Sequence, residues 1–477
     1  MQKFNLLIAG QGSKNKSFEP VVTPYSGEVI AEVETATVQD VERAVDQAEL
    51  AAVTWRRTPA HKRYEIMMAA AALADERQEQ MAQIISQENG KSILEARSEA
   101  ARSGEIMRLS AFEGSQLYGV GLPLDANKGT GQEKLGFTLP QPVGVVVAIT
   151  PFNYPALLVM HKIGPALAVG NAVILKPART TPLTALALAQ CFIDAGLPEG
   201  VLSVITGPGA ELGEALVTNP KVRKISFTGS TKVGESITRI AGVKKLSLEL
   251  GASSPVVVLS DADIEFAAHA VSIGGYVNAG QVCISVQRVI VEKSIRANFL
   301  DALRPKVAAL KYGNPLDESN NIGSMISESE AMRVAASIKE STSQGANLLL
   351  GGEREGSYVQ PTILTDVDPD SSIAQQELFG PAVVISNAND DREAIALANS
   401  TVYGLGAGVF TKNMDKAIES MREIDAGIIH VNWTPLWRAD LMPYGGLKSS
   451  GIGKEGIRTT VSEMTESKTI IMHGRAW

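Results

Sequence analysis

A thiol, a carboxylate and a side-chain amide, in three separate segments, are the residues best suited to chemistry. Cys283 lies in residues 280–285, at the end of a predicted helix and just before an apolar strand. A lone cysteine in such a place is more often a small buried apolar residue than a nucleophile. The presence of Glu249 and Asn153 favours a nucleophile, because a carboxylate can act as a general base and a side-chain amide can donate a hydrogen bond to an oxyanion.

Composition narrows the class of protein. The chain has 477 residues, 44% hydrophobic and 20% charged, which is ordinary for a globular enzyme with more than one hydrophobic core. With two cysteines a disulfide framework is excluded, and the net charge of -8 does not favour nucleic-acid binding. Residues 1–10 lack a signal-peptide core, and no apolar run is long enough to span a membrane. We therefore expect a cytoplasmic protein that binds neither nucleic acid nor membrane.

The order of the expected elements indicates an α/β fold. Residues 38–118 have helical periodicity and predict three or four amphipathic helices. From Val143 onwards, short apolar strands alternate with helices, which is typical of a parallel sheet covered on both faces. The strands are expected at 143–149, 172–175, 201–205, 224–227 and 246–250, and the helices at 155–169, 182–195, 210–217 and 231–241. A second such series runs from 255 to 427, with a helix at 263–279 and strands at 288–291 and 382–385.

Several motifs in order along the chain accompany the three chemical residues. Beyond Cys283, Glu249 and Asn153, they are Phe227-Thr228-Gly229-Ser230 with Gly234, Glu377-Leu378-Phe379-Gly380-Pro381, and Pro443-Tyr444-Gly445-Gly446-Leu447-Lys448. On these residues the chain resembles the NAD(P)-dependent aldehyde dehydrogenase superfamily over nearly its whole length.

The resemblance implies two Rossmann-like, doubly wound parallel-sheet domains and a small β arm. The expected cofactor-binding domain is 1–119 with 143–251, and the expected catalytic domain is 252–451. The arm, 120–142 with 460–477, would join subunits into a homodimer or homotetramer.

The cofactor site is predicted without the common dinucleotide fingerprint, since Gly207-Pro208-Gly209 lacks the third glycine. The helix that begins after Gly229-Ser230 offers free N–H groups to a pyrophosphate, and the absence of Lys-Ser/Thr after Gly234 excludes a P-loop. Many relatives have a ribose-binding glutamate at position 179, whereas this chain has Arg179, which could pair with a 2′-phosphate. NADP, or both NADP and NAD, is therefore favoured over NAD alone. The full expected cofactor set is Ile149, Thr150, Pro151, Phe152, Lys176, Ala178, Arg179, Gly209, Phe227, Thr228, Gly229, Ser230, Leu250, Gly251, Glu377 and Phe379.

The family chemistry assigns the catalytic roles. Cys283 would attack the aldehyde, and Asn153 with the Cys283 backbone N–H would stabilise the thiohemiacetal oxyanion. After hydride departure, Glu249 would activate the water that hydrolyses the thioester. Lys162 would orient cofactor or catalytic groups, or would be a surface lysine. A CoA-acylating enzyme, whose relatives generally lack that glutamate, and a non-catalytic member of the fold remain alternatives.

The substrate prediction depends on the loop before the Pro-Tyr-Gly-Gly motif. Arg438 resembles the anion-binding arginine of enzymes for glyceraldehyde 3-phosphate, phosphonoacetaldehyde, sulfolactaldehyde and lactaldehyde, although it could instead pair with Asp440 and fix the loop. Val282 replaces an arginine of some phosphonate-binding relatives, which disfavours phosphonoacetaldehyde. We expect a small anionic or hydroxylated aldehyde; a succinate-semialdehyde or broad-specificity enzyme is the alternative. The expected substrate residues are Tyr154, Val282, Ile284, Trp437 and Arg438, and the five scattered histidines predict no metal.

Overall fold

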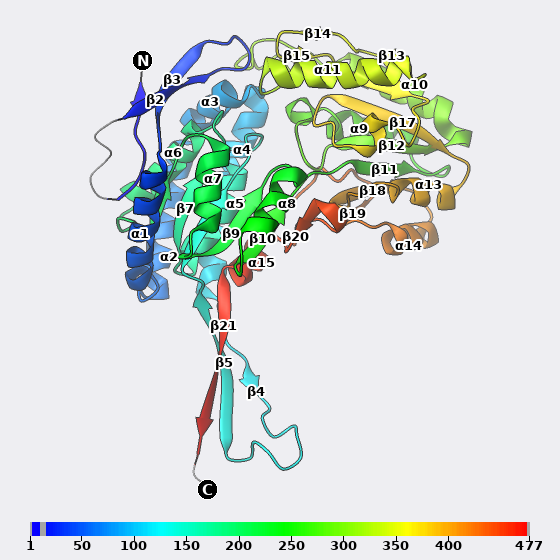
Figure 1. Cartoon of the computed structure of the whole chain (residues 1–477). Coiled ribbons are helices and arrows are strands. Elements are labelled where there is room, and N and C mark those ends of the chain that lie inside the picture. Colours follow the sequence, from blue (N-terminus) through cyan, green and yellow to red (C-terminus); the bar gives the residue numbers. More distant parts are fainter. Residues whose placement is uncertain (1, 10–15, 475–477) are drawn as a thin grey trace.

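Two open parallel sheets organise the protein in a computed structural model that describes residues 2–9 and 16–474 (Figure 1). The first sheet is antiparallel only at its edge strand β20, and the second only at its edge strand β13. Its strand order is β20 (Gly451–Ile452), β10 (Lys245–Glu249), β9 (Val222–Thr228), β6 (Val145–Ile149), β7 (Ala172–Lys176) and β8 (Leu202–Val204). The second sheet runs in the order β13 (Asn347–Leu350), β16 (Thr362–Thr365), β17 (Ala382–Ala388), β12 (Val286–Glu292), β11 (Ser254–Val258), β18 (Gly406–Phe410) and β19 (Ile428–Val431).

Helices cover both faces of each sheet, as expected for near-continuous apolar strands. In the first domain one face of the sheet is covered by α1 (Val38–Trp55), α7 (Gly209–Thr218) and α8 (Thr231–Ile240). The core on the other face of the sheet is formed by α2 (Ala60–Glu76), α3 (Gln78–Asn89), α4 (Ile93–Ser115), α5 (Leu157–Ala168) and α6 (Leu183–Asp194). In the second domain α9 (Ile264–Gly274), α10 (Arg296–Ala308), α11 (Glu328–Ser343) and the short α12 (Ser372–Gln375) line one core, and α13 (Asp391–Ala398) with α14 (Met414–Glu423) borders the other.

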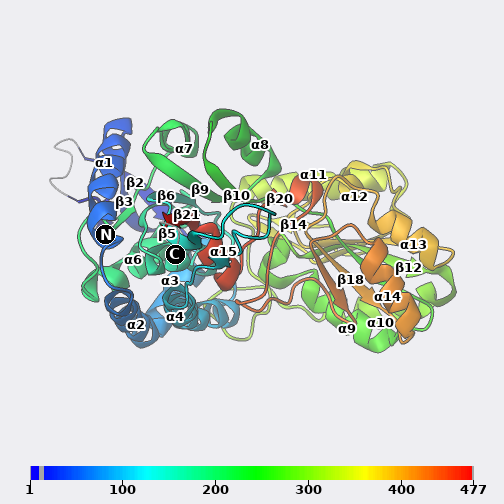
Figure 2. The same ribbon diagram turned by 90° about the horizontal axis from the view of Figure 1, so that it is seen from below.

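A three-stranded sheet of β21 (Thr465–His473), β5 (Lys134–Pro142) and β4 (Gly121–Leu122) projects away from both domains (Figure 1). Seen from below, it lies under the first domain, with the second domain to one side (Figure 2). The helix α15 (Ile457–Glu463) packs into the core of the first domain rather than into this arm. The arm therefore begins at Thr465 rather than at the expected residue 460, because Ile457, Val461 and Met464 are buried against that core. Residues 475–477 of the expected arm lie outside the described residues.

The N-terminal segment forms a small sheet of β1 (Lys3–Phe4), β3 (Val29–Thr35) and β2 (Ser17–Val22). Further along the chain, β14 (Arg354–Glu355) and β15 (Tyr358–Val359) form a hairpin. In the first sheet Ile149 aligns with Phe227 on one neighbouring strand and with Lys176 on the other. Because parallel strands end at one edge, the expected site residues that follow them gather there.

Candidate active site

Cys283 is carried by an irregular segment between α9 and β12, which we call the Cys283 segment (residues 277–285). The expected helix over 263–279 is wrong at its end, since α9 stops at Gly274 and a 3-10 turn covers Val277–Gly280. Within that turn Asn278 and Ala279 have φ of 50° and 53°, and Gly280 has a φ of 70°. Glycine adopts such backbone freely and asparagine tolerates it, so Ala279 is the strained residue of the three. A Cβ on Gly280 would also lie 2.1 Å from the carbonyl oxygen of Gly380.

The thiol faces a small pocket of about 80 Å³. Its Sγ lies 3.0 Å from the hydroxyl of Tyr444. Burial raises the pKa of Cys283 to about 12, and the nearby charges of Glu377 and Glu249 raise it too, so the resting group is a neutral thiol. The pocket is lined by Arg102, Asn153, Tyr154, Leu157, Leu158, His161, Val282, Cys283, Ile284, Leu436, Arg438 and Tyr444.

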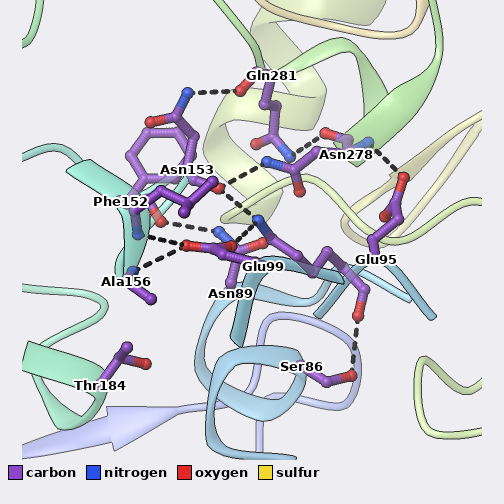
Figure 3. A network of polar contacts seen from close by, with 12 residues as sticks. Ser86, Asn89, Glu95, Glu99, Phe152, Asn153, Ala156, Thr184, Asn278 and Gln281 are labelled. Carbon is purple, nitrogen blue, oxygen red and sulfur yellow. Dashed lines mark hydrogen bonds and ion pairs between the residues drawn. The ribbon is translucent and has the colours of Figure 1, made fainter. Parts of the chain in front are cut away.

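Asn153 lies in the loop between β6 and α5, which we call the Asn153 loop (residues 150–156). Its side chain is 3% exposed and lines the same pocket as Cys283. Its Nδ2 donates to the carbonyl of Gln281 at 2.9 Å, and its Oδ1 has no partner (Figure 3). The amide therefore bridges to the Cys283 segment, two residues before the thiol.

Glu249 ends β10 and is 3% exposed, so it is a buried carboxyl and not a solvent-exposed glutamate at a strand end. Its Oε2 is buried without a hydrogen-bond partner. Burial, followed by the charge of Glu455, raises the pKa of Glu249 well above its usual value, and Lys162 and Arg438 act in the opposite direction. A buried carboxyl with a raised pKa and an unpartnered oxygen is suited to take a proton from water.

Lys162 is fully buried on α5, not a surface lysine. It forms an ion pair with Glu455, and its Nζ lies 3.2 Å from the hydroxyl of Ser226. Burial alone would raise the pKa of Glu455, but the charges of Lys162 and Arg438 outweigh it and hold that pKa below its usual value. Glu455 is therefore a negative charge beside Glu249.

Arg438 is only 10% exposed and belongs to a chain of charged contacts. Its guanidinium carbon lies 3.9 Å from the ring centre of Tyr444, and one Nη lies 3.3 Å from Nδ1 of His161 and 3.7 Å from Glu455. Its Nε is buried without a partner.

The expected alternative of an Arg438–Asp440 pair is not what the structure contains. Asp440 pairs with Arg102 and contacts Nε2 of His161 at 3.1 Å. Burial, followed by the charge of Arg438, lowers the pKa of His161 to about 4, so this imidazole is neutral. Asp440 is thereby occupied with partners other than Arg438, which leaves Arg438 beside the pocket.

Three of the other four expected substrate residues line the pocket, and one does not. Tyr154, Val282 and Ile284 line the pocket with Cys283. Trp437 is 57% exposed, contacts His430 at a ring distance of 6.2 Å and is not among the lining residues. Arg102 and Glu455 are residues of this site that sequence reasoning missed, since each comes from a segment without a recognisable pattern.

The expected cofactor residues gather at the carboxyl edge of the first sheet. Lys176 ends β7, is 4% exposed, has no ion-pair partner among the described residues, and burial lowers its pKa to about 8. A Cβ on Gly209, at the start of α7, would lie 4.0 Å from its Nζ. After Gly229, Ser230 precedes α8 without a side-chain cap to the first turn. An unpaired buried cation and an uncapped helix start are the features that suit a pyrophosphate.

The same edge includes further residues of the expected set, with polar atoms free to bind. The hydroxyls of Thr150 and Thr228 are buried without partners. Burial raises the pKa of Glu377 to about 7, and its Oε1 accepts from the N–H of Ala252, while a Cβ on Gly251 would lie 2.9 Å from its Oε2. Phe379 has a left-handed φ of 52° and meets Phe152 edge to face at 5.8 Å. Pro151 lies in the Asn153 loop, Ala178 follows Lys176, and Leu250 packs beneath Gly234.

Arg179 is exposed and already paired. Its Nε and Nη2 donate to the two carboxylate oxygens of Glu19 on β2, at 2.7 and 2.9 Å. A 2′-phosphate at this place would have to compete with Glu19 for the guanidinium.

Neither a metal cluster nor a membrane span emerges within 2–9 and 16–474. No group of three or more His, Cys, Asp or Glu in those ranges could hold a metal ion. No helix there is long and apolar enough to cross a bilayer.

Comparison with known proteins gives a consistent set of relatives. Residues 11–470 match the family described as "Aldehyde dehydrogenase family". A 3-sulfolactaldehyde dehydrogenase of Priestia aryabhattai is 45% identical over 99% of this chain and 98% of its own. Aldehyde dehydrogenase 21 of Physcomitrella patens, in complex with the reaction product succinate, superposes with a TM-score of 0.96 at 34% identity over 99% and 98% of the two chains. The NADP complex of the glyceraldehyde-3-phosphate dehydrogenase GapN of Methanocaldococcus jannaschii superposes with a TM-score of 0.93. The two sequences are 38% identical, and the match covers 97% of this chain and 100% of the GapN chain.

Proposed function

The chain belongs to the aldehyde dehydrogenase family, and from that premise we propose that it oxidises a small aldehyde carrying one anionic group to the carboxylic acid. It is an oxidoreductase, and either NAD or NADP fits it. The observation that carries the proposal is the placement of Arg438 and Arg102 in the lining of the pocket that contains Cys283.

Cys283 is the proposed nucleophile. The thiol passes its proton to solvent water as its sulfur bonds to the aldehyde carbon, and the carbonyl oxygen becomes an oxyanion. Asn153 and the backbone N–H of Cys283 are the proposed donors to this oxyanion; losing one such donor typically costs on the order of 100- to 1000-fold in rate. When bound, NAD(P)+ accepts the hydride that leaves the adduct.

Glu249 is the proposed base for the second half of the reaction. Hydride departure leaves a thioester on Cys283, and Glu249 takes a proton from the water that attacks it. The tetrahedral adduct expels the sulfur, Glu249 returns the proton to it, and the acid departs from a regenerated thiol. The raised pKa and the unpartnered Oε2 support this role, and they favour hydrolysis over transfer to coenzyme A.

Two observations favour an anionic group on the substrate. The Nε of Arg438 is buried without a partner, which is costly unless a ligand supplies an acceptor. Most of the other lining residues are apolar (Leu157, Leu158, Val282, Ile284 and Leu436). Arg438 and Arg102 are therefore the groups that would bind a negative charge on the substrate. Sulfolactaldehyde and succinate semialdehyde are the candidate anionic substrates, lactaldehyde is their neutral hydroxylated counterpart, and Val282 gives no second cation for phosphonoacetaldehyde.

Arg179 suggests NADP or dual use. Its guanidinium can pair with a 2′-phosphate, and Glu19 is the acceptor that the phosphate would displace. The domain division into 1–119 with 143–251 for cofactor and 252–451 for catalysis remains our interpretation of the two sheets.

Self-association through the arm is also proposed. Its strand β21 lies at the edge of the sheet, and Ile471 and Met472 on this strand are 37% and 55% exposed. Exposed apolar residues on an unpaired edge strand favour pairing with another chain. Light scattering of the protein should give a dimer or tetramer, and a monomer would contradict this part of the proposal.

The test of the function is the reduction of cofactor by a panel of aldehydes with NAD and NADP in parallel. The panel comprises sulfolactaldehyde, lactaldehyde, succinate semialdehyde, glyceraldehyde 3-phosphate, phosphonoacetaldehyde and a neutral alkanal. We expect the highest kcat/KM for small anionic aldehydes without added coenzyme A. Equal kcat/KM for the neutral alkanal would contradict the substrate class, and a requirement for coenzyme A would contradict the role of Glu249.

A further inference from the structure

A buried ion pair lies behind the pocket rather than in it. Lys91 follows α3, Glu99 lies on α4, and their side chains are each 1% exposed with Nζ and Oε2 2.7 Å apart. Neither residue lines the pocket around Cys283. Burying two charges costs several kcal/mol of desolvation per ion, so such a pair is a weak source of stability. What the pair contacts is therefore informative.

Both members of the pair hold the Asn153 loop. The Nζ of Lys91 donates to the backbone carbonyl of Asn153 at 2.7 Å and lies 4.0 Å from the ring centre of Tyr154. The other oxygen of Glu99 accepts the backbone N–H groups of Ala156 and Leu157, at 2.8 and 3.1 Å. The loop is thus held at its middle by the cation and at its end by the anion (Figure 3).

The Cys283 segment joins the same point from the second domain. The Nδ2 of Asn278 donates to the carbonyl of Asn153 at 3.0 Å, and the N–H of Asn278 donates to Glu95 on α4 at 2.9 Å. Asn153 returns a contact through its side chain to Gln281. Figure 3 shows Asn153 between Asn278 and Gln281 on one side and Glu99 on the other. One backbone carbonyl therefore accepts hydrogen bonds from Lys91 and from the strained turn before Cys283.

We propose that Lys91 and Glu99 are positioning residues that fix Asn153 relative to Cys283, so that the oxyanion donors of the two domains meet in one geometry. This inference rests on the proposed role of Asn153. The pair acts through the loop and touches no reacting atom. A displacement of about 1 Å in such a donor costs on the order of 100-fold in rate.

A role in folding alone makes a different prediction, so a double-mutant cycle separates the two. The first variant is Lys91→Met with Glu99→Gln, which removes both charges of the pair together. The second is Asn153→Ala, and the third combines all three substitutions. The measured quantity is the rate constant of cofactor reduction in the first turnover at saturating aldehyde, with the Kd of NADP titrated in parallel.

We expect the neutral pair variant to lower that rate constant about 10- to 100-fold with an unchanged Kd for NADP. In the Asn153→Ala background the same pair of substitutions should cost less than about 3-fold, because residues that act through one another are not additive. Equal losses in both backgrounds would overturn the inference. A first-turnover rate unaffected by Asn153→Ala would instead remove the proposed role of Asn153 itself.

Lys224→Met is the matched control. Lys224 is fully buried in the same domain, and its Nζ contacts Ser247 and Glu463 instead of the Asn153 loop. Its loss should lower thermal stability and leave the first turnover within about 3-fold. A comparable rate loss in Lys224→Met would show that any buried lysine has this effect and would overturn the inference. Failure of the neutral pair variant to fold would identify the pair as a folding element and would overturn it too.

Discussion

Two buried carboxylates near Cys283 have opposite surroundings. Glu99 is satisfied by the Lys91 ammonium on one oxygen and by two backbone N–H groups on the other. Glu249 ends a strand with an unpartnered Oε2, and burial raises its pKa well above the usual value. Their burial is nearly equal, at 2% and 3% exposure.

The contrast separates positioning from chemistry. A fully partnered buried carboxylate fixes the segment to which its partners belong, here the Asn153 loop. An unpartnered carboxyl has paid the desolvation cost without compensation, and its proton affinity is correspondingly high. Arg438 resembles Glu249 in this respect, because its Nε is buried without a partner. This atom is where a ligand could provide a hydrogen-bond acceptor.

The largest expected effect comes from removing the thiol. Cys283→Ala should lower aldehyde oxidation by on the order of 1000-fold or more, because no other nucleophile lines the pocket with a comparable reactivity. Titration of NADP should give an unchanged Kd, since Cys283 is not in the expected cofactor set. Residual activity within 10-fold of the unsubstituted enzyme would place the chemistry elsewhere.

The next largest effect is expected from Gly445→Ala, which tests whether the position of the Glu249 carboxyl matters for catalysis. A Cβ on Gly445 would lie 2.6 Å from Oε1 of Glu249, and the φ of Gly445 is 153°. Gly445→Ala should therefore displace the carboxyl and lower kcat about 100-fold. Gly213→Ala, whose Cβ would meet nothing within 4 Å, is the control and should leave kcat unchanged. A normal kcat in Gly445→Ala would mean that the position of Glu249 is not critical.

Arg438→Met should separate substrates by charge. Losing a charge-assisted hydrogen bond of about 1.5–3 kcal/mol corresponds to roughly a 10- to 100-fold rise in KM for an anionic aldehyde. The neutral alkanal should keep its KM within about 3-fold, which serves as the internal control. Parallel losses for both substrates would identify Arg438 as a loop brace.

The smallest effect concerns the cofactor. Glu19→Gln should free the Arg179 guanidinium and tighten NADP binding a few-fold while leaving the Kd of NAD unchanged, because exposed ion pairs are worth at most about 1 kcal/mol. Fluorescence titration with each nucleotide measures this directly. A tighter Kd for NAD to the same degree would show that the 2′-phosphate is not what Arg179 meets.

The features that local sequence patterns determine could be predicted, whereas those that depend on contacts between distant segments could not. The apolar strand–helix units predicted the first sheet closely, since β7 and β9 lie where 172–175 and 224–227 were expected. The motif residues Cys283 and Asn153 do line one pocket. The helix expected up to Ala279 failed because Glu95 and the carbonyl of Asn153 hold Asn278 in a left-handed turn, a constraint from another domain.

The missed residues show the same limit. Glu455 has no local pattern, and its importance comes from contacts with Lys162 and Arg438 far away in the chain. Likewise the exposed appearance of Lys91 and Glu99 in a helical stretch conceals their burial. Long-range polar contacts of this kind leave no periodicity in the sequence.

The most direct test of the account is a stopped-flow measurement of cofactor reduction in Glu249→Gln with an anionic aldehyde. The account predicts a rapid burst of reduced cofactor, stoichiometric with active sites, followed by turnover lowered about 100- to 10,000-fold, because the thioester on Cys283 forms but no base hydrolyses it. A steady-state rate like that of the unsubstituted enzyme would contradict the role of Glu249. The absence of a burst would contradict the separation of acylation from hydrolysis on which the account is built.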